Sequence, residues 1–262
     1  MKMILTDLDE TLLHSDKTIS SYTIEIFNRC KEKGFLVGFC TSRGKVNIKP
    51  FLEKINPQII ICNNGACIYY NDELIHTESF TIEETRKLLS TVFKVCGKNC
   101  EMTLDTLDNI FWNRKENKSA VCADDAIYND FSDFNEPAMK FCVKMQDRKK
   151  AKEIASSVSS CDYLPFSDIP WYKFSSGNAT KEFAIKFLSK HLNIPLEEII
   201  CFGDDFNDIG MLKLCGKGIA VSNAILEVKN IADEVTLSNN EDGVAKYIEK
   251  NLKKGDRILE VG

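Results

Sequence analysis

The sequence predicts an α/β protein in which a doubly wound, mostly parallel sheet is interrupted by a small α+β domain. Short apolar runs alternate with helical patterns near both ends of the chain, which is typical of parallel strands joined by right-handed crossovers. In the middle of the chain this alternation gives way to short strands with one polar face. Two halves of one sheet therefore bracket an inserted domain.

The first half of the predicted sheet begins near the N-terminus. Residues 3–6 form an apolar strand, and residues 20–33 carry apolar side chains at helical spacing before Gly34, a residue that favours the end of a helix. The other elements predicted in this half are strands over 35–40 and 58–62, a helix over 46–55, and a hairpin of 66–70 and 74–77.

The predicted insertion starts with a helix that Thr81 and Glu84 open as a capping box and that continues to about Val95. Residues 140–145 are apolar at every second position, which predicts a strand of a half-exposed sheet. The β/α alternation resumes at Thr180. The elements predicted after it are strands over 199–202, 218–221 and 234–237, a helix directly after Thr180, helices that end near Leu214 and start at Ala224, and a helix over 241–252 followed by a charged tail.

The bulk composition is that of a globular enzyme. The 262 residues are 44% hydrophobic and 28% charged, which favours one large domain or two modest ones. The formal net charge of -5 argues against a nucleic-acid partner, because such partners select a basic face. A small anionic substrate stays compatible with this charge, since a metal ion can supply positive charge locally.

The cysteines and the N-terminus indicate a cytoplasmic protein without a membrane partner. The 11 cysteines are scattered and lack zinc-site spacing, with Cys96 and Cys100 as the nearest pair. Cys40, Cys62 and Cys201 lie in apolar runs and are interpreted as buried thiols in a reducing cytosol. The N-terminus lacks the profile of a signal peptide, and no apolar run reaches membrane-spanning length.

Two carboxylates, Asp7 and Asp9, directly follow the first predicted strand. At a strand end they can lie side by side, so that one attacks phosphorus while the other transfers a proton. An aspartyl nucleophile would split ester hydrolysis into two displacements through an acyl phosphate. The alternative is an aspartate-rich turn without catalytic function.

A second acidic loop, Gly203-Asp204-Asp205-Phe206-Asn207-Asp208, follows the predicted strand over 199–202. Two anionic loops that face each other repel unless a divalent cation lies between them. Mg²⁺ suits carboxylate and carbonyl ligands and can bridge to a phosphate oxygen. The alternative is that Asp204 or Asp205 only caps a helix.

Thr41, Ser42 and Lys181 complete a predicted phosphate site. The hydroxyl groups end the second strand and can donate hydrogen bonds to phosphate oxygens, and Lys181 near a helix start can add a positive charge. Taken singly, a hydroxyl in a turn usually only caps the local backbone, and a lysine on a helix is usually solvated. Their order together with the two acidic loops predicts a metal-dependent phosphohydrolase.

Competing motifs do not fit. Gly44-Lys45 lacks the first glycine and the final Ser/Thr of a phosphate-binding P-loop, because Phe39 and Val46 occupy those positions. The three histidines lie apart from any serine or cysteine that would suggest a catalytic triad, and are interpreted as structural or surface residues. They are His14, His76 and His191.

Five motifs in their usual order resemble the haloacid dehalogenase-like superfamily, and within it the Cof-like phosphatases with a large inserted cap domain. The matching stretches are Asp7-Leu8-Asp9-Glu10-Thr11-Leu12-Leu13, Asn64-Gly65-Ala66, the Gly203-to-Asp208 loop, Ala220-Val221-Ser222-Asn223-Ala224 and Glu241-Asp242-Gly243-Val244-Ala245. The resemblance covers essentially the whole chain. It implies a Rossmann-like catalytic core over 1–80 and 172–262 and a substrate-specificity cap over 81–171.

The resemblance also implies roles for single residues. Asp7 would be the nucleophile and Asp9 the general acid/base, while Thr41, Ser42 and Lys181 would hold the phosphoryl group. Mg²⁺ would be held by the carboxylates of Asp7 and Asp204 and the backbone carbonyl of Asp9, with Asp208 as a ligand or a support. Asn207 is similar to a family residue that touches the phosphate or orients the lysine.

Three residues depart from the usual family pattern, in which glycine is common. Glu10 follows Asp9, Ser42 follows Thr41, and Glu182 follows Lys181. None of the three removes a required functional group. Glu10 adds an anion near the site, which would change metal affinity or leaving-group preference, or would be harmless if the side chain points outward from the turn. In the cap, five aromatic residues either line a pocket for a sugar or nucleoside or form the cap's own core. They are Phe111, Trp112, Phe166, Trp171 and Tyr172.

The sequence thus predicts a Mg²⁺-dependent phosphomonoester hydrolase that acts on small phosphorylated metabolites, with sugar phosphates as the favoured class. A phosphosugar mutase with the same nucleophile and an inactive protein that binds phosphorylated metabolites are the alternatives. We expect a monomer or a weak homodimer.

Overall fold

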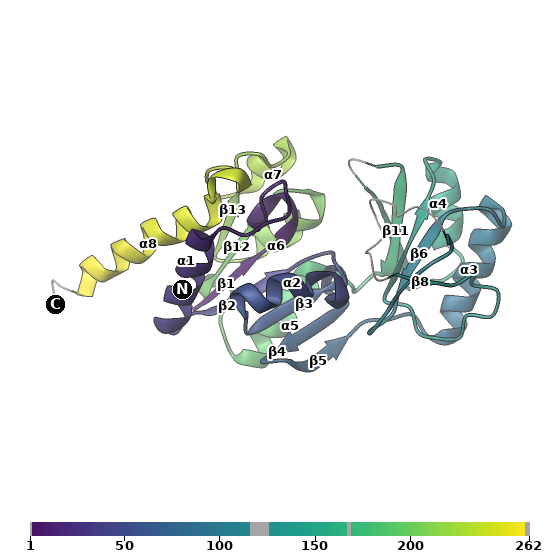
Figure 1. Cartoon of the computed structure of the whole chain (residues 1–262), viewed down its shortest axis with the longest axis horizontal. Helices are drawn as coiled ribbons and strands as arrows, with labels where there is room; N and C mark the ends of the chain where they lie inside the picture. Colours follow the sequence, from purple (N-terminus) through teal and green to yellow (C-terminus); the bar gives the residue numbers. More distant parts are fainter. Residues whose placement is uncertain (1, 116–125, 167–168, 260–262) are drawn as a thin grey trace. The chain divides into compact units, whose positions relative to one another are not determined.

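The computed structural model describes residues 2–115, 126–166 and 169–259, and side chains in the last helix up to residue 252. The chain folds into two compact units (Figure 1). The first comprises Met1–Ser42, Lys49–Ile75 and Thr180–Gly262, and the second comprises Arg43–Ile48 and His76–Ala179.

The first unit is built on an eight-stranded sheet with the strand order β14-β13-β12-β1-β2-β3-β4-β5. Its strands are β1 (Met3–Thr6), β2 (Leu36–Cys40), β3 (Ile59–Cys62), β4 (Cys67–Tyr70), β5 (Glu73–Thr77), β12 (Ile199–Gly203), β13 (Lys217–Ala220) and β14 (Glu234–Val235). The pairs from β14 to β3 are parallel, and β4 pairs antiparallel with β3. Met3, Ile4 and Leu5 of β1 are fully buried, as expected for a strand covered on both faces. The predicted doubly wound sheet is confirmed.

Helices join these strands. They are α1 (Ser21–Glu32), α2 (Lys45–Ile55), α5 (Lys181–Leu192), α6 (Ile209–Leu214), α7 (Leu226–Ile231) and α8 (Gly243–Leu259). The Thr180 side chain caps the start of α5 by accepting a hydrogen bond from the backbone N–H of Phe183, which sets Lys181 as the first residue of the helix. Helix α8 continues to Leu259, so the helix end predicted near Leu252 is wrong. Lys and Arg have sufficient helix propensity to extend a helix past its last packed turn.

The second unit contains a six-stranded sheet with the order β10-β11-β9-β6-β7-β8. Its elements are α3 (Ile82–Cys96), β6 (Met102–Asp105), β7 (Ile110–Trp112), β8 (Ile127–Tyr128), β9 (Lys140–Lys144), α4 (Arg148–Ala155), β10 (Cys161–Pro165) and β11 (Trp171–Ser176). The capping box of Thr81 and Glu84 opens α3 as predicted. The rings of Phe141 and Phe174 stack with centroids 4.9 Å apart in the core of this unit.

Two expectations for this unit need correction. The predicted boundary between residues 171 and 172 falls inside β11, whose pairing with β9 and β10 holds the segment up to Ala179 in the second unit. The predicted polar face of β9 is exposed only at its end, because Lys144 is 51% exposed whereas Lys140 and Cys142 are 11% and 2% exposed.

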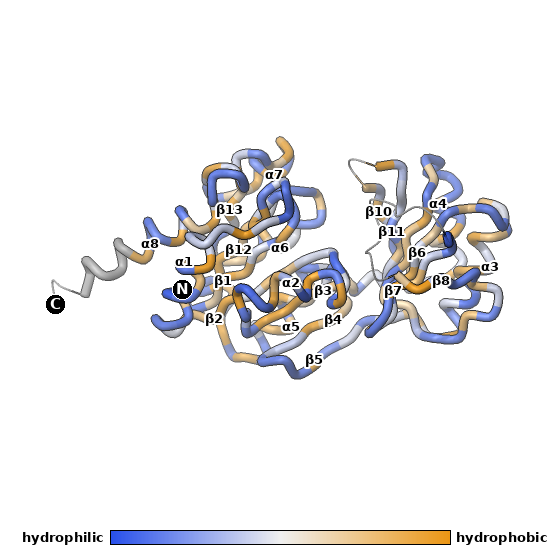
Figure 2. Tube along the Cα trace, in the orientation of Figure 1, coloured by the Kyte–Doolittle hydropathy of each residue, from blue (hydrophilic) through white to orange (hydrophobic). Residues whose placement is uncertain are grey.

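Hydrophobic stretches lie along the strands, and many of the connecting turns are hydrophilic (Figure 2). Within the residues that the structure describes, none of the helices combines the length and apolar character needed to span a membrane.

Candidate active site

Three predicted site segments meet at one edge of the first sheet. Asp7 follows β1, Thr41 follows β2 and Asp204 follows β12. Strand β1 pairs in parallel with both β2 and β12, so the three carboxyl ends point the same way. The loops that the sequence separates by almost 200 residues therefore lie side by side.

The acidic residues of these loops form one cluster. Asp7, Asp204 and Asp208 each offer a carboxylate oxygen, and these oxygens lie within 4.8 Å of one another. The Thr11 hydroxyl donates a hydrogen bond of 2.6 Å to Asp204 Oδ1. Asp208 is fully buried, and its Oδ2 accepts the backbone N–H groups of Asp204 and Asp205 at 2.9 and 3.2 Å. Asp208 therefore fixes the loop that carries Asp204.

Lys181 holds two of the three carboxylates. Its Nζ donates to Asp7 Oδ1 at 2.6 Å and to Asp208 Oδ1 at 2.5 Å, and the lysine is 1% exposed. Burial alone would lower the pKa of Lys181, but the charges of Asp208 and Asp7 raise it above its usual range. The ammonium group is thus a permanent positive charge among three acids.

One ammonium does not neutralise this cluster. Burial raises the pKa of Asp7 to about 7. The attraction of Lys181 opposes this rise, and the repulsion of Asp208 adds to it. Burial, with repulsion from Asp7 and Asp208, raises the pKa of Asp204 to about 8. Raised pKa values of this kind mean that the acids hold protons near neutral pH unless a cation replaces them.

Asp9 is placed differently. Its side chain is 38% exposed, and Asp9 Oδ1 lies 3.2 Å from Nζ of Lys17. The backbone of the next residue, Glu10, has a positive φ of 53°, which turns the chain between Asp9 and Thr11. The carboxylate of Asp9 is not among the three that cluster, so only its backbone carbonyl stays a predicted metal ligand.

Ser42 and Asn207 come together, as a shared phosphate-binding role requires. Asn207 Nδ2 donates to Ser42 Oγ at 2.7 Å, and the Ser42 hydroxyl donates to Asn64 Oδ1 at 3.2 Å. The backbone N–H of Asn64 donates to the carbonyl of Thr41 at 2.9 Å. Asn64 was named from the sequence only as part of the Asn64-Gly65-Ala66 motif, without a role.

Gly65 is a second residue that sequence reasoning missed. It has a φ of 107°, and a Cβ at this position would lie 2.2 Å from the carbonyl oxygen of Thr180. Only glycine permits this approach, which brings the start of α5, and with it Lys181, against the turn after β3. The Asn64-Gly65 pair was the available signal.

The other expectations can be placed as well. Glu182 pairs with Lys186 one helical turn onward on the surface of α5. Phe111 and Tyr172 belong to the hydrophobic core of the second unit, and Trp112 and Trp171 are buried as well.

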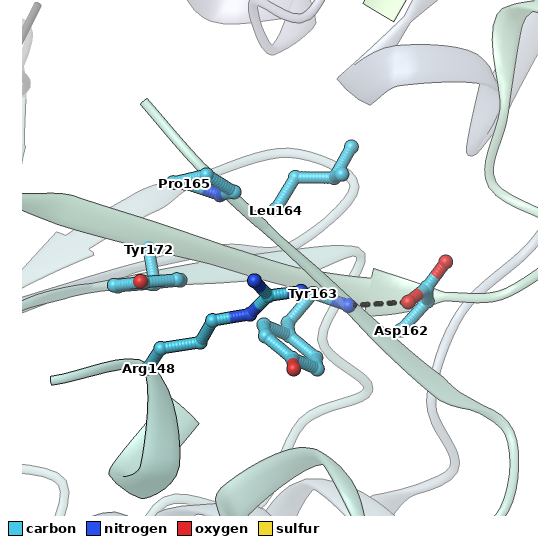
Figure 3. Close-up of a pocket in the computed structure, with 6 residues that line it drawn as sticks. All are labelled: Arg148, Asp162, Tyr163, Leu164, Pro165 and Tyr172. Atoms are coloured by element: carbon cyan, nitrogen blue, oxygen red, sulfur yellow. Dashed lines mark hydrogen bonds between the residues drawn. The ribbon is translucent and has the colours of Figure 1, made fainter. Parts of the chain in front are cut away.

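A hollow of about 540 Å³ lies in the second unit, and Figure 3 shows its lining side chains. They are Arg148, Asp162, Tyr163, Leu164, Pro165 and Tyr172. Of the predicted aromatic residues only Tyr172 takes part, and none of the predicted catalytic or metal-binding residues does.

Comparison with known proteins decides the family. A family model described as haloacid dehalogenase-like hydrolase matches residues 4–248. The chain belongs to the haloacid dehalogenase-like hydrolases. The predicted resemblance, including its Cof-like subgroup, is confirmed.

Individual relatives of this haloacid dehalogenase-like hydrolase are phosphatases. Phosphatase YwpJ of Bacillus subtilis is 30% identical in an alignment 299 residues long, gaps included, which covers 96% of this chain and 100% of YwpJ. The 5-amino-6-(5-phospho-D-ribitylamino)uracil phosphatase YitU of the same organism is 27% identical over 266 residues, covering 95% of this chain and 96% of YitU. The HAD subclass IIB sugar phosphatase BT4131 has a similar structure, with a TM-score of 0.80, 25% identity and coverage of 95% of this chain and 98% of its own. The chain is therefore a phosphatase.

Proposed function

We propose that this phosphatase hydrolyses phosphate monoesters of small metabolites, with sugar phosphates as the favoured class, through an aspartyl-phosphate intermediate and with Mg²⁺ as cofactor. The observation that carries the proposal is the buried cluster in which Lys181 Nζ lies within hydrogen-bonding distance of both Asp7 and Asp208. The similarity to the sugar phosphatase BT4131 supports the substrate class.

The donor set of the cluster fits Mg²⁺. It consists of oxygen atoms alone, and the raised pKa values of Asp7 and Asp204 indicate that positive charge is missing among them. We assign the ligands to the carboxylates of Asp7 and Asp204 and the backbone carbonyl of Asp9, with Asp208 as a ligand or a support. When bound, the ion neutralises charge on the transferring phosphoryl group.

The chemical steps are assigned to two residues. The Asp7 carboxylate attacks phosphorus, the bond from phosphorus to the ester oxygen breaks, and Asp9 donates its proton to the leaving oxygen. Asp9 then takes a proton from water, which attacks the acyl phosphate, releases inorganic phosphate and restores the carboxylate of Asp7. Each step leaves atoms and charge balanced.

The phosphoryl oxygens are assigned to four donors. Lys181 supplies a fixed positive charge, because its Nζ is already held by two carboxylates. Ser42 and Asn207 are connected by a hydrogen bond and present a hydroxyl and an amide, and Thr41 precedes them at the end of β2. Donors held before the substrate arrives need no reorganisation during the reaction.

We assign substrate specificity to the second unit, as a cap that excludes water from the reaction. The family relation and the separate core of this unit support this assignment. We also propose a cytoplasmic location, supported by the free thiols of the described cysteines.

A phosphate-release screen over a panel of phosphorylated sugars and other metabolites, with and without Mg²⁺, tests the proposal. We expect Mg²⁺-dependent release of inorganic phosphate and its loss in Asp7→Asn. Isomerisation of a sugar phosphate without phosphate release would instead indicate a mutase, and turnover that survives Asp7→Asn would refute the assigned nucleophile.

A further inference from the structure

The side chain of Glu10, the residue after Asp9, is held from several sides. Its backbone has φ 53° and ψ 9°, the left-handed conformation that glycine adopts most easily. Its Oε1 accepts from Lys17 Nζ at 2.9 Å, and its Oε2 accepts from Ser15 Oγ and Asn239 Nδ2, both at 3.2 Å. Its carbonyl oxygen accepts from Asn223 Nδ2 at 2.7 Å. Glu10 is thus a fixed point of the turn.

Lys17 connects this fixed point to Asp9. The Lys17 ammonium lies 2.9 Å from Glu10 Oε1 and 3.2 Å from Asp9 Oδ1. The backbone of Lys17 also has a positive φ, of 63°, so two strained residues face each other across this contact. The Lys17 ammonium thus bridges the anchored carboxylate of Glu10 and the carboxylate of Asp9, which we assign to proton transfer.

We propose that Lys17 and Glu10 are positioning residues for Asp9: Glu10 fixes the Lys17 ammonium, and the ammonium fixes the Asp9 carboxylate through Oδ1. This inference rests on the proposed function, in which Asp9 is the general acid/base. The inference also gives Glu10 a role. The hydrogen bonds that Glu10 accepts stabilise the left-handed backbone at this position, which glycine would adopt without them.

The anchoring distinguishes this bridge from an ordinary surface ion pair. An exposed pair contributes little because two long side chains must be ordered for one contact. Here Asn239 and Ser15 already order Glu10, so only Lys17 is left to be fixed. The Lys217–Glu234 pair, far along the sheet in β13 and β14, has nearly the same exposure, 41% and 47% against 45% and 43% for Lys17 and Glu10. It therefore serves as a matched control.

The chemistry of the leaving group provides the readout. A sugar alkoxide is a strong base and must be protonated as it leaves, whereas p-nitrophenolate leaves without help. A residue that positions the general acid should therefore matter for sugar phosphates and hardly for p-nitrophenyl phosphate. A merely structural role would lower both rates alike.

The experiment measures kcat and KM of the full chain with Mg²⁺ on p-nitrophenyl phosphate and on the best sugar phosphate of the screen. For Lys17→Met we expect kcat on the sugar phosphate to fall about 10–100-fold, within the range of a proton-transfer contribution, with less than about threefold change on p-nitrophenyl phosphate. Lys17→Arg should recover most of the loss. Lys217→Met should match the wild type on both substrates.

Glu10→Gln keeps the shape of the side chain and is expected to cause the same selective loss to a smaller extent, about 3–10-fold. Because both residues act through Asp9, the Glu10→Gln/Lys17→Met double variant should be no slower than Lys17→Met. Equal losses on the two substrates in a folded variant, or no loss in either single variant, would overturn the inference while the proposed function stood. Failure of the Asp7→Asn control would overturn both.

Discussion

Asp204→Asn is expected to stabilise the metal-free protein at alkaline pH and to remove most of its stabilisation by Mg²⁺. The folded protein keeps a proton on Asp204 up to about pH 8, whereas the unfolded chain releases it near 3.8. Between these values the folded state binds more protons than the unfolded state, so the stability of the metal-free protein falls as pH rises. Asparagine removes the charge that must be buried at the upper end of this window.

The size of the effect follows from the pKa of Asp204, about 8 against 3.8. At about 1.4 kcal/mol for each pH unit, a shift of about four units sets an upper limit of about 6 kcal/mol. Because Asp7 and Asp208 share the repulsion, we expect a gain of about 2–4 kcal/mol, or roughly 5–10 °C in Tm.

Thermal unfolding with EDTA or with saturating MgCl₂ measures this gain at about pH 5, in the lower part of the window, and at about pH 9, above it. Wild type should lose Tm toward alkaline pH in EDTA and regain it with MgCl₂. The variant should lose less Tm, because only the raised pKa of Asp7 remains, and should regain little of it with MgCl₂. Asp72→Asn, in the exposed turn between β4 and β5, is the control and should behave as wild type. An Asp204→Asn protein that is less stable than wild type in alkaline EDTA, or that keeps the full Mg²⁺ shift, would refute the electrostatic reasoning.

Three further predictions concern single contacts. Lys181→Met leaves two buried carboxylates without their cation and should cost about 3–5 kcal/mol in chemical denaturation as well as nearly all activity; wild-type stability would contradict the buried bridge. Gly65→Ala places a Cβ against the carbonyl of Thr180 and should lower the free energy of unfolding by about 3 kcal/mol or more, with a lower kcat. The control Gly34→Ala, with a φ of 81° and open space around it, should lower the free energy of unfolding by only about 1–2 kcal/mol and leave kcat unchanged. Ser42→Ala removes the hydroxyl that we assign to a phosphate oxygen and that also bonds Asn207 and Asn64, so kcat/KM should fall about 10–100-fold with a loss of stability of about 1–2 kcal/mol; an unchanged kcat/KM would exclude Ser42 from the phosphate site.

The convergence of the site could be predicted because it depends on topology alone. Once β1, β2 and β12 are parallel neighbours, the residues that follow them must meet at one edge, whatever their side chains do. Lys181 was predictable for a similar reason, since a threonine cap fixes the first residue of α5.

What depended on long-range pairing could not be predicted. Residues 171–176 have a strand pattern that suits either sheet, and only pairing with β9 and β10 decides between them. The bridge from Glu10 to Asp9 was hidden for another reason. It requires left-handed backbone at both Glu10 and Lys17, a conformation that side chains of their type rarely adopt and that no sequence pattern indicates.

The position of Lys181 explains why the three clustered acids are not equivalent. The ammonium contacts Asp7 and Asp208 directly, but Asp204 receives only a hydroxyl hydrogen bond, from Thr11. Burial raises the pKa of both acids, of Asp7 to about 7 and of Asp204 to about 8, and Lys181 opposes the rise in each. Lys181 attracts the ionised form of Asp7 through a direct contact, but with both pKa values at or above neutral, both carboxylates need a cation to ionise fully. In the proposed mechanism, the lysine thus contacts the assigned nucleophile Asp7 directly, whereas Asp204 is left to the Thr11 hydroxyl and the proposed Mg²⁺.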